Sequence, residues 1–103
     1  MSKMYWVYIL KCSDGSYYTG STSNIEKRIS EHQNGLIKGY TYSRRPVKLV
    51  FSEHFNRAYD AISAERQIKG WRRAKKIALI KGNYDLLVKL SNEKNWKNND
   101  SCT

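Results

Sequence analysis

In VYILKCSDGSYYTG, residues 7–20, two apolar runs flank an Asp-Gly pair, a pattern typical of a β-hairpin. A loop of three residues that ends with Gly15 in the left-handed conformation would pair Tyr8 with Gly20. Tyr8 and Tyr18 would then lie on the same face of the sheet, whereas a loop of even length would separate them. The hairpin therefore either holds two phenols over one site or uses its tyrosines for strand packing.

The composition indicates one small, basic, globular domain. A chain of 103 residues has room for a single core. Its formal net charge of +10 is typical of a protein that binds nucleic acid. The two cysteines, Cys12 and Cys102, form neither a metal motif nor a disulfide framework. Because no apolar run has membrane-spanning length and no signal-peptide pattern opens the chain, we expect a cytoplasmic protein without membrane contact.

The pattern along the chain predicts an α+β fold, a small three-stranded antiparallel sheet flanked by helices in the order ββαβαα. Ser23, followed by Glu26 three residues later, predicts the start of the first helix, and Asn34-Gly35 predicts its end. A domain over residues 1–90 and a disordered polar tail over residues 91–103 are expected. The predicted strands are 5–11, 16–20 and 47–51, and the predicted helices are 24–33, 56–70 and 71–81, with a further helical turn in 84–90.

Two polar side chains share a face with apolar residues on the first helix. Ile25 and Ile29 mark the inward face, and the spacing places Arg28 and His32 along its edge, one turn apart. A solvated arginine and a structural histidine are the alternatives to a functional pair.

A carboxylate falls on the apolar stripe of the second helix. Glu65 lies in line with Ala61 and Ile68, and a core-facing carboxylate is costly unless it is paired or binds a metal. Pairing with a buried arginine is the structural alternative.

Basic residues cluster in two segments. Between Arg66 and Lys81 there are seven Lys/Arg and no acidic residue, and the loop over 38–45 mixes basic and aromatic side chains. Such interleaving suits phosphate contact with base stacking, although Trp71 is expected to be a buried anchor. The residues predicted to bind nucleic acid are Arg44, Arg45, Lys69, Arg72, Arg73, Lys75 and Lys76.

The ordered set of these motifs resembles the GIY-YIG nuclease superfamily. Val7-Tyr8-Ile9 is followed by Tyr18-Thr19-Gly20, then by Arg28, His32 and Glu65, over roughly residues 4–82. In particular, the chain is similar to the small stand-alone members named after the UvrC repair nuclease or the URI group, of which ERQIKGWRRAKKIALI is characteristic. The resemblance implies the GIY-YIG nuclease fold.

The resemblance also implies roles for individual residues. Tyr8 and Tyr18 would line the site, and one of them would position or deprotonate the attacking water. Arg28 would bind the scissile phosphate, His32 would assist as a base or phosphate ligand, and Glu65 would be the sole protein ligand of one divalent ion, Mg²⁺ or Mn²⁺. Ser21-Thr22 departs from the family, because UvrC-like members carry a lysine there.

These inferences predict a metal-dependent endonuclease that hydrolyses DNA phosphodiester bonds, structure-selective and active in DNA repair or related processing, with RNA as a second possible substrate. Because no separate DNA-binding domain is evident, a protein partner or a homodimer is a further expectation. The alternative is a catalytically weak or inactive nucleic-acid-binding module that acts with a partner, and a third reading is a basic RNA- or ribosome-associated protein.

Overall fold

The computed structural model describes residues 3–95, and the chain divides into two compact units, residues 1–70 and 71–103. The first unit contains β1 (Tyr5–Lys11), β2 (Tyr17–Thr22), α1 (Ile25–Gln33), a 3₁₀ turn (Tyr42–Arg44), β3 (Lys48–Phe55) and α2 (Ala58–Lys69). The second contains α3 (Arg73–Ile80) and α4 (Tyr84–Asn95). The predicted α+β class and element order are confirmed.

The sheet is antiparallel with the strand order β2-β1-β3, so β2 is an edge strand. Beyond the last ladder pair, Lys11 with Tyr17, Cys12 N–H donates to Ser16 O at 2.8 Å, so the loop proper has three residues, 13–15. Gly15 closes the loop with φ +85°, the left-handed conformation that a glycine adopts without a Cβ penalty. The odd-length loop predicted from the sequence is therefore confirmed.

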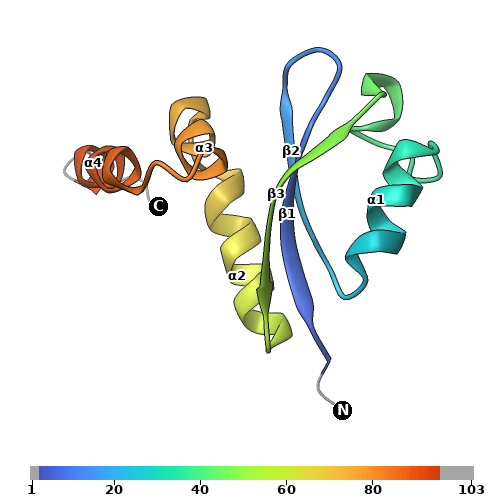
Figure 1. Ribbon diagram of the computed structural model, residues 1–103, viewed down its shortest axis with the longest axis horizontal. Helices are drawn as coiled ribbons and strands as arrows, with labels where there is room; N and C mark the ends of the chain where they lie inside the picture. The colour runs from blue at the N-terminus through green and yellow to red at the C-terminus, as the bar shows by residue number, and fades with distance from the viewer. Residues whose placement is uncertain (1–2, 96–103) are drawn as a thin grey trace. The chain divides into compact units, whose positions relative to one another are not determined.

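The helices α1 and α2 cover opposite faces of the sheet (Figure 1). Tyr8 and Leu10 point to the α1 face, where Ile25 and Ile29 pack against them. Val7 and Ile9 alternate with them and so point to the face that α2 covers. All four central residues of β1 are buried, which explains why this strand is an unbroken apolar run.

Element boundaries differ from the predictions where side-chain contacts decide them. Asn24, and not Ser23, caps α1, because its side chain accepts a hydrogen bond from Lys27 N–H at 3.1 Å. Strand β3 continues four residues beyond its predicted end, to Phe55, because it pairs with β1 along that strand's whole length.

The second unit is a pair of short helices. Helix α4 spans 12 residues, Tyr84–Asn95, where the sequence predicts only a helical turn. The predicted polar tail overlaps the end of α4 and otherwise lies outside the described residues, so it stays a prediction. Within residues 3–95, none of the helices has the length and apolar character needed to span a membrane.

Candidate active site

Three aromatic rings meet on the α1 face of the sheet. The ring centroids of Tyr8 and Tyr18 are 6.3 Å apart, and His32 lies 5.8 Å from Tyr8 and 5.2 Å from Tyr18. The register of the hairpin is the cause, because Tyr8 pairs with Gly20 and Tyr18 pairs with Leu10. The two motif tyrosines therefore share a face, as predicted.

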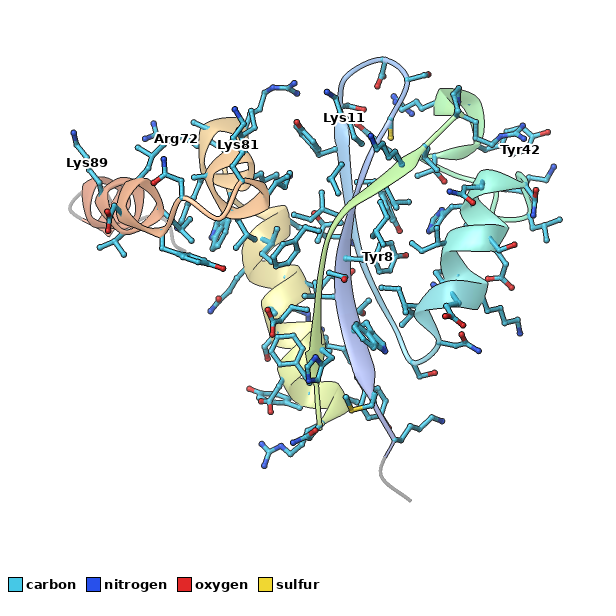
Figure 2. The ribbon with its side chains drawn as sticks, in the orientation of Figure 1. Tyr8, Lys11, Tyr42, Arg72, Lys81 and Lys89 are labelled. Carbon is cyan, nitrogen blue, oxygen red and sulfur yellow. The ribbon has the colours of Figure 1, made fainter. Side chains whose placement is uncertain are left out.

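The Tyr8 phenol is enclosed by the protein. Its side chain is fully buried on the α1 side of the sheet (Figure 2). Its Oη lies 2.9 Å from His32 Nε2. Burial, together with the neighbouring Tyr18 phenol, raises the pKa of Tyr8 to about 12, although the positive charge of Arg28 acts in the opposite direction. A Cβ on Gly20 would lie only 2.5 Å from the Tyr8 Oη, so the glycine makes room for this phenol.

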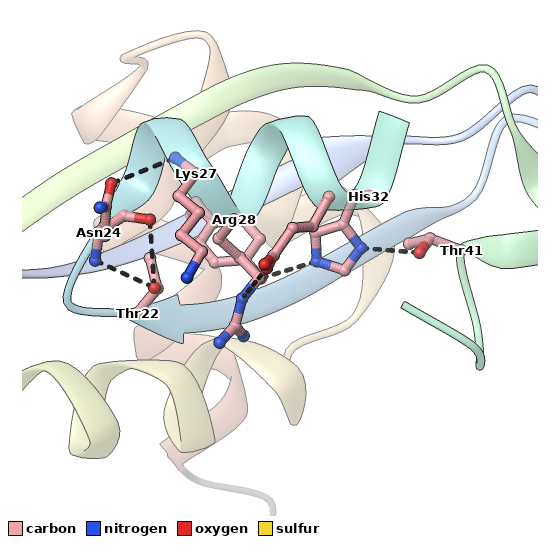
Figure 3. A network of polar contacts seen from close by, with 8 residues as sticks. Thr22, Asn24, Lys27, Arg28, His32 and Thr41 are labelled. Atoms are coloured by element: carbon pink, nitrogen blue, oxygen red, sulfur yellow. Dashed lines mark hydrogen bonds and ion pairs between the residues drawn. The ribbon is translucent and has the colours of Figure 1, made fainter. Parts of the chain in front are cut away.

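His32 is part of the protein interior and not of the helix edge where the periodicity places it. It is 1% exposed, and its Nδ1 lies 2.7 Å from the hydroxyl oxygen of Thr41, a buried residue that precedes the 3₁₀ turn (Figure 3). Burial and the nearby Arg28 lower the pKa of His32, so the imidazole is neutral at pH 7. The prediction of an edge position is wrong because periodicity alone does not reveal the loop that covers this end of α1.

Arg28 lies at the outer side of the same cluster. Its Nε is 3.3 Å from Glu31 Oε1, and the arginine side chain is 40% exposed. An exposed pair of this kind is worth about 0.2–1 kcal/mol, so the guanidinium is free to exchange this partner for a phosphate.

Glu65 lies on the α2 side of the sheet with two polar partners. Ser21 Oγ donates to its Oε1 at 2.6 Å, and Lys69 Nζ lies 2.8 Å from its Oε2. Burial alone would raise the pKa of Glu65, but the hydrogen bonds from Lys69 and Ser21 hold it below its usual range. The buried arginine considered as a structural partner is absent from these contacts, and a lysine of the same helix takes its place.

The two groups of side chains meet around the edge strand β2. Ser21 points to the α2 face and Tyr18 to the α1 face, and Lys69 Nζ lies 5.9 Å from the centroid of the Tyr18 ring. Because β2 has no further strand on its outer side, the half-buried Tyr18 and the partly exposed Glu65 both lie at one edge of the sheet.

The donor set around Glu65 fits a hydrated Mg²⁺ or Mn²⁺ ion. Within residues 3–95 no group of three or more His, Cys, Asp or Glu side chains gathers for a metal. A single carboxylate is nevertheless sufficient for Mg²⁺, which keeps several waters and takes phosphate oxygens as further ligands. Glu65 is 18% exposed and supplies a hard oxygen, whereas the Lys69 ammonium already occupies a cation position on it.

The loop before β3 carries cations that lie against aromatic rings. Tyr40 stacks on Tyr18 at 5.9 Å, and the Arg44 guanidinium lies 4.0 Å from the Tyr40 centroid. Arg44 also pairs with Asp14 at 3.1 Å, and Arg45 Nε donates to the backbone oxygen of Tyr42. Both predicted DNA-binding arginines therefore already have protein partners, which limits the ring surface left for base stacking.

The second unit carries most of the remaining predicted nucleic-acid contacts. Arg72 (labelled in Figure 2) and Arg73 have exposed side chains, whereas Lys76 is half-buried. Lys75 is 7% exposed with its ammonium 4.2 Å from the Trp71 ring centroid, so it is poorly placed to reach a phosphate in this conformation. Trp71 is half-buried, close to the anchor role expected for it.

The family model described as "GIY-YIG catalytic domain" matches residues 4–78, and the chain belongs to this family.

The similar proteins are small single-domain chains. A UPF0213 protein of Staphylococcus saprophyticus is 49% identical over 76 residues, which are 74% of this chain and 93% of that protein. A UPF0213 protein of Syntrophus aciditrophicus is 54% identical over 84 residues, 81% of this chain and 95% of that one.

Solved structures share the same fold. The solution NMR structure of a UPF0213 protein from Bacillus halodurans has 38% identity and a TM-score of 0.51, over 76% of this chain and 83% of that one. The NMR structure of an E. faecalis protein has 35% identity and a TM-score of 0.56, over 82% and 92% of the two chains.

The sequence analysis missed three contacts of the site, and only one of them had a signal in the sequence. Thr41 has no local signal, because only the packing of its loop brings it to His32. Ser21 draws notice only as a departure from the family, and it proves to be a hydrogen-bond donor to Glu65. Lys69 is predicted as a nucleic-acid contact, and its spacing of four residues from Glu65 is the one available signal for their ion pair.

Proposed function

We propose that this chain is a metal-dependent endonuclease that hydrolyses DNA phosphodiester bonds, selects its substrate by structure, and acts in the cytoplasm in DNA repair or related processing. One observation carries the proposal: Glu65, on the inward side of α2, and the Tyr8–Tyr18–His32 cluster lie on either side of one edge strand. A simple nucleic-acid-binding domain has no need of a partly buried carboxylate at that place.

The burial of the two tyrosines supports different roles for them. Tyr18 is half-buried at the edge strand, so its side chain is the one suited to orient the attacking water and, as a phenolate, to take its proton. Tyr8 is enclosed and remains protonated at neutral pH, so it acts as a hydrogen-bonding partner and not as the base. His32 has no exposed surface for a phosphate, and it acts through Tyr8.

Charge stabilisation would come from both sides of the edge strand. Arg28 would leave Glu31 to bind the scissile phosphate with its fork of donors, because a guanidinium keeps its charge at every relevant pH. Glu65 would hold the divalent ion, which supplies Lewis-acid stabilisation of the phosphate charge when bound. Lys69 would have to leave Glu65 first, and its half-exposed side chain leaves it free to turn toward the DNA backbone.

The second candidate function is a nucleic-acid-binding module with weak or no turnover, acting with a partner. Its support is that Lys69 already neutralises Glu65 and that Tyr8 is enclosed. In either case the exposed cations of the second unit would bind DNA or RNA through phosphates, and a protein partner or second copy would add contacts that one small chain lacks.

The test is cleavage of labelled single-stranded, duplex, flap and branched DNA, and of RNA, with Mg²⁺, Mn²⁺ or EDTA. Glu65→Ala is the site variant, and Glu53→Ala, which removes an exposed carboxylate of β3, is the matched control. Metal-dependent cutting that disappears only in Glu65→Ala supports the nuclease. Binding without cutting in either metal supports the binding module.

A further inference from the structure

A chain of three buried polar side chains leads from the candidate active site into the protein. Tyr8 Oη lies 2.9 Å from His32 Nε2. On the other side of the ring, His32 Nδ1 lies 2.7 Å from Thr41 Oγ1, the contact drawn between these two labelled residues in Figure 3. The three side chains are 0%, 1% and 1% exposed. Because water does not reach them, each polar atom depends on its protein partner.

The chemistry of a neutral imidazole forces the two neighbours into opposite roles. One ring nitrogen carries a proton and donates, and the other only accepts. Either Tyr8 donates to Nε2 while Nδ1–H donates to Thr41, or Thr41 donates to Nδ1 while Nε2–H donates to Tyr8.

The surroundings of Tyr8 favour the first arrangement. In the second, the phenolic proton would have to find another acceptor in the interior, close to the positive charge of Arg28. That charge repels a proton and attracts the lone pairs of the phenol oxygen. A phenolic proton is confined near the ring plane, whereas the hydroxyl proton of Thr41 rotates freely to suit its surroundings.

We propose that Thr41 is a positioning residue of the active site, whose hydroxyl accepts the His32 Nδ1–H and so fixes the tautomer in which Nε2 accepts from Tyr8. The Tyr8 proton is then held by the histidine, and its oxygen lone pairs face Arg28. The role in the active site rests on the proposed nuclease function, while the tautomer itself does not.

The segment that carries Thr41 is well suited to this task. Its neighbour Tyr40 stacks on Tyr18, and Arg44 ties the same segment to Asp14 of the hairpin loop. Consecutive residues of one loop therefore contact both His32 and Tyr18, and the loop is fastened to the strand pair that carries the tyrosines.

The test is the ¹⁵N chemical shifts of the imidazole nitrogens at neutral pH, with the exposed His54 as internal reference. Wild type and Thr41→Ser, which keeps the hydroxyl, should both have His32 in the Nδ1–H tautomer. Thr41→Val removes the acceptor at nearly constant size and should shift His32 toward Nε2–H. Should this variant fail to fold, Thr41→Cys, which lacks a strong acceptor, gives the same comparison.

A wild-type Nε2–H tautomer, or an unchanged Nδ1–H tautomer in the variant without an acceptor, would overturn the inference. In the cleavage assay, Thr41→Val should lower kcat about 10-fold with KM little changed, by analogy with outer partners of functional histidines, and Thr41→Ser should restore it. If the tautomers are as expected but the wild type cleaves no substrate, the nuclease proposal is refuted and the positioning of His32 by Thr41 stands. Cleavage by a wild type whose His32 is in the Nε2–H tautomer would support the nuclease proposal and refute the positioning role of Thr41.

Discussion

The two motif tyrosines should respond differently to loss of the phenol oxygen. Tyr8→Phe removes a fully buried hydroxyl and leaves His32 Nε2 without its hydrogen-bond partner. Leaving a buried acceptor unpaired costs about 1–3 kcal/mol, and at about 2 kcal/mol the melting temperature of a unit of this size falls by about 8–16 °C. Tyr18→Phe removes a hydroxyl from a half-buried ring and should change the free energy of unfolding by less than about 0.5 kcal/mol.

The loss of activity should be larger for Tyr18→Phe than for Tyr8→Phe, the opposite of their order in loss of stability. If Tyr18 takes the proton of the attacking water, Tyr18→Phe should lower kcat by about 10²-fold or more, while Tyr8→Phe lowers it about 10-fold. Urea denaturation followed by circular dichroism gives the stability of both variants, and initial rates on the preferred DNA substrate give kcat. The division of roles is refuted if Tyr8→Phe is as stable as wild type, or if Tyr18→Phe keeps more than about a third of the activity.

Four further outcomes test the site. Arg28→Gln and Glu65→Gln should each lower the cleavage rate about 10²-fold or more with the fold intact, and a lost melting transition in either variant would contradict this. Lys69→Gln should tighten Mn²⁺ binding about 2- to 5-fold in calorimetry, because a partly exposed ion pair of about 0.5–1 kcal/mol no longer competes for Glu65, and Lys27→Gln should leave Mn²⁺ binding unchanged. Since burial lowers the pKa of His32 in the folded protein, the unfolded chain binds its proton more tightly, so stability should be complete above about pH 6.5 and fall as the pH drops below it. Urea midpoints at several pH values, in wild type and His32→Gln, check this.

The hairpin could be read from the sequence because its information is local. The Asp-Gly turn and the alternation along both strands predict a hairpin, and a glycine that tolerates the left-handed conformation allows the odd-length loop; the structure selects that loop over one of even length. The register of the odd-length loop placed Tyr8 and Tyr18 on one face, and the structure confirms it. The boundaries were less certain, since adjacent Ser23 and Asn24 are both good capping residues and only the side-chain geometry selects Asn24.

Contacts between distant segments could not be read in the same way. His32 is buried because a loop nine residues later in the sequence supplies Thr41, and helical periodicity contains no information about that loop. Glu65 was recognisable as an unusual carboxylate on an apolar stripe. Its partner Ser21 lies 44 residues away in the sequence, and only the folded structure brings the two side chains together.

The two halves of the site differ in how freely their side chains can move, and this difference bears on the order of events. Tyr8, His32 and Thr41 are buried and hydrogen-bonded to one another, so they form a fixed frame. Lys69 is half-exposed and tied to the site by an ion pair that a divalent cation can replace. In the proposed nuclease, ligand exchange would therefore take place at Glu65. Because Lys69 belongs to the same helix turn, its ammonium would stay close to the incoming phosphate after the metal ion replaced it. Binding of the metal ion and binding of the DNA backbone would then each increase the affinity for the other. A site with a single carboxylate could in this way hold its ion mainly when substrate is present.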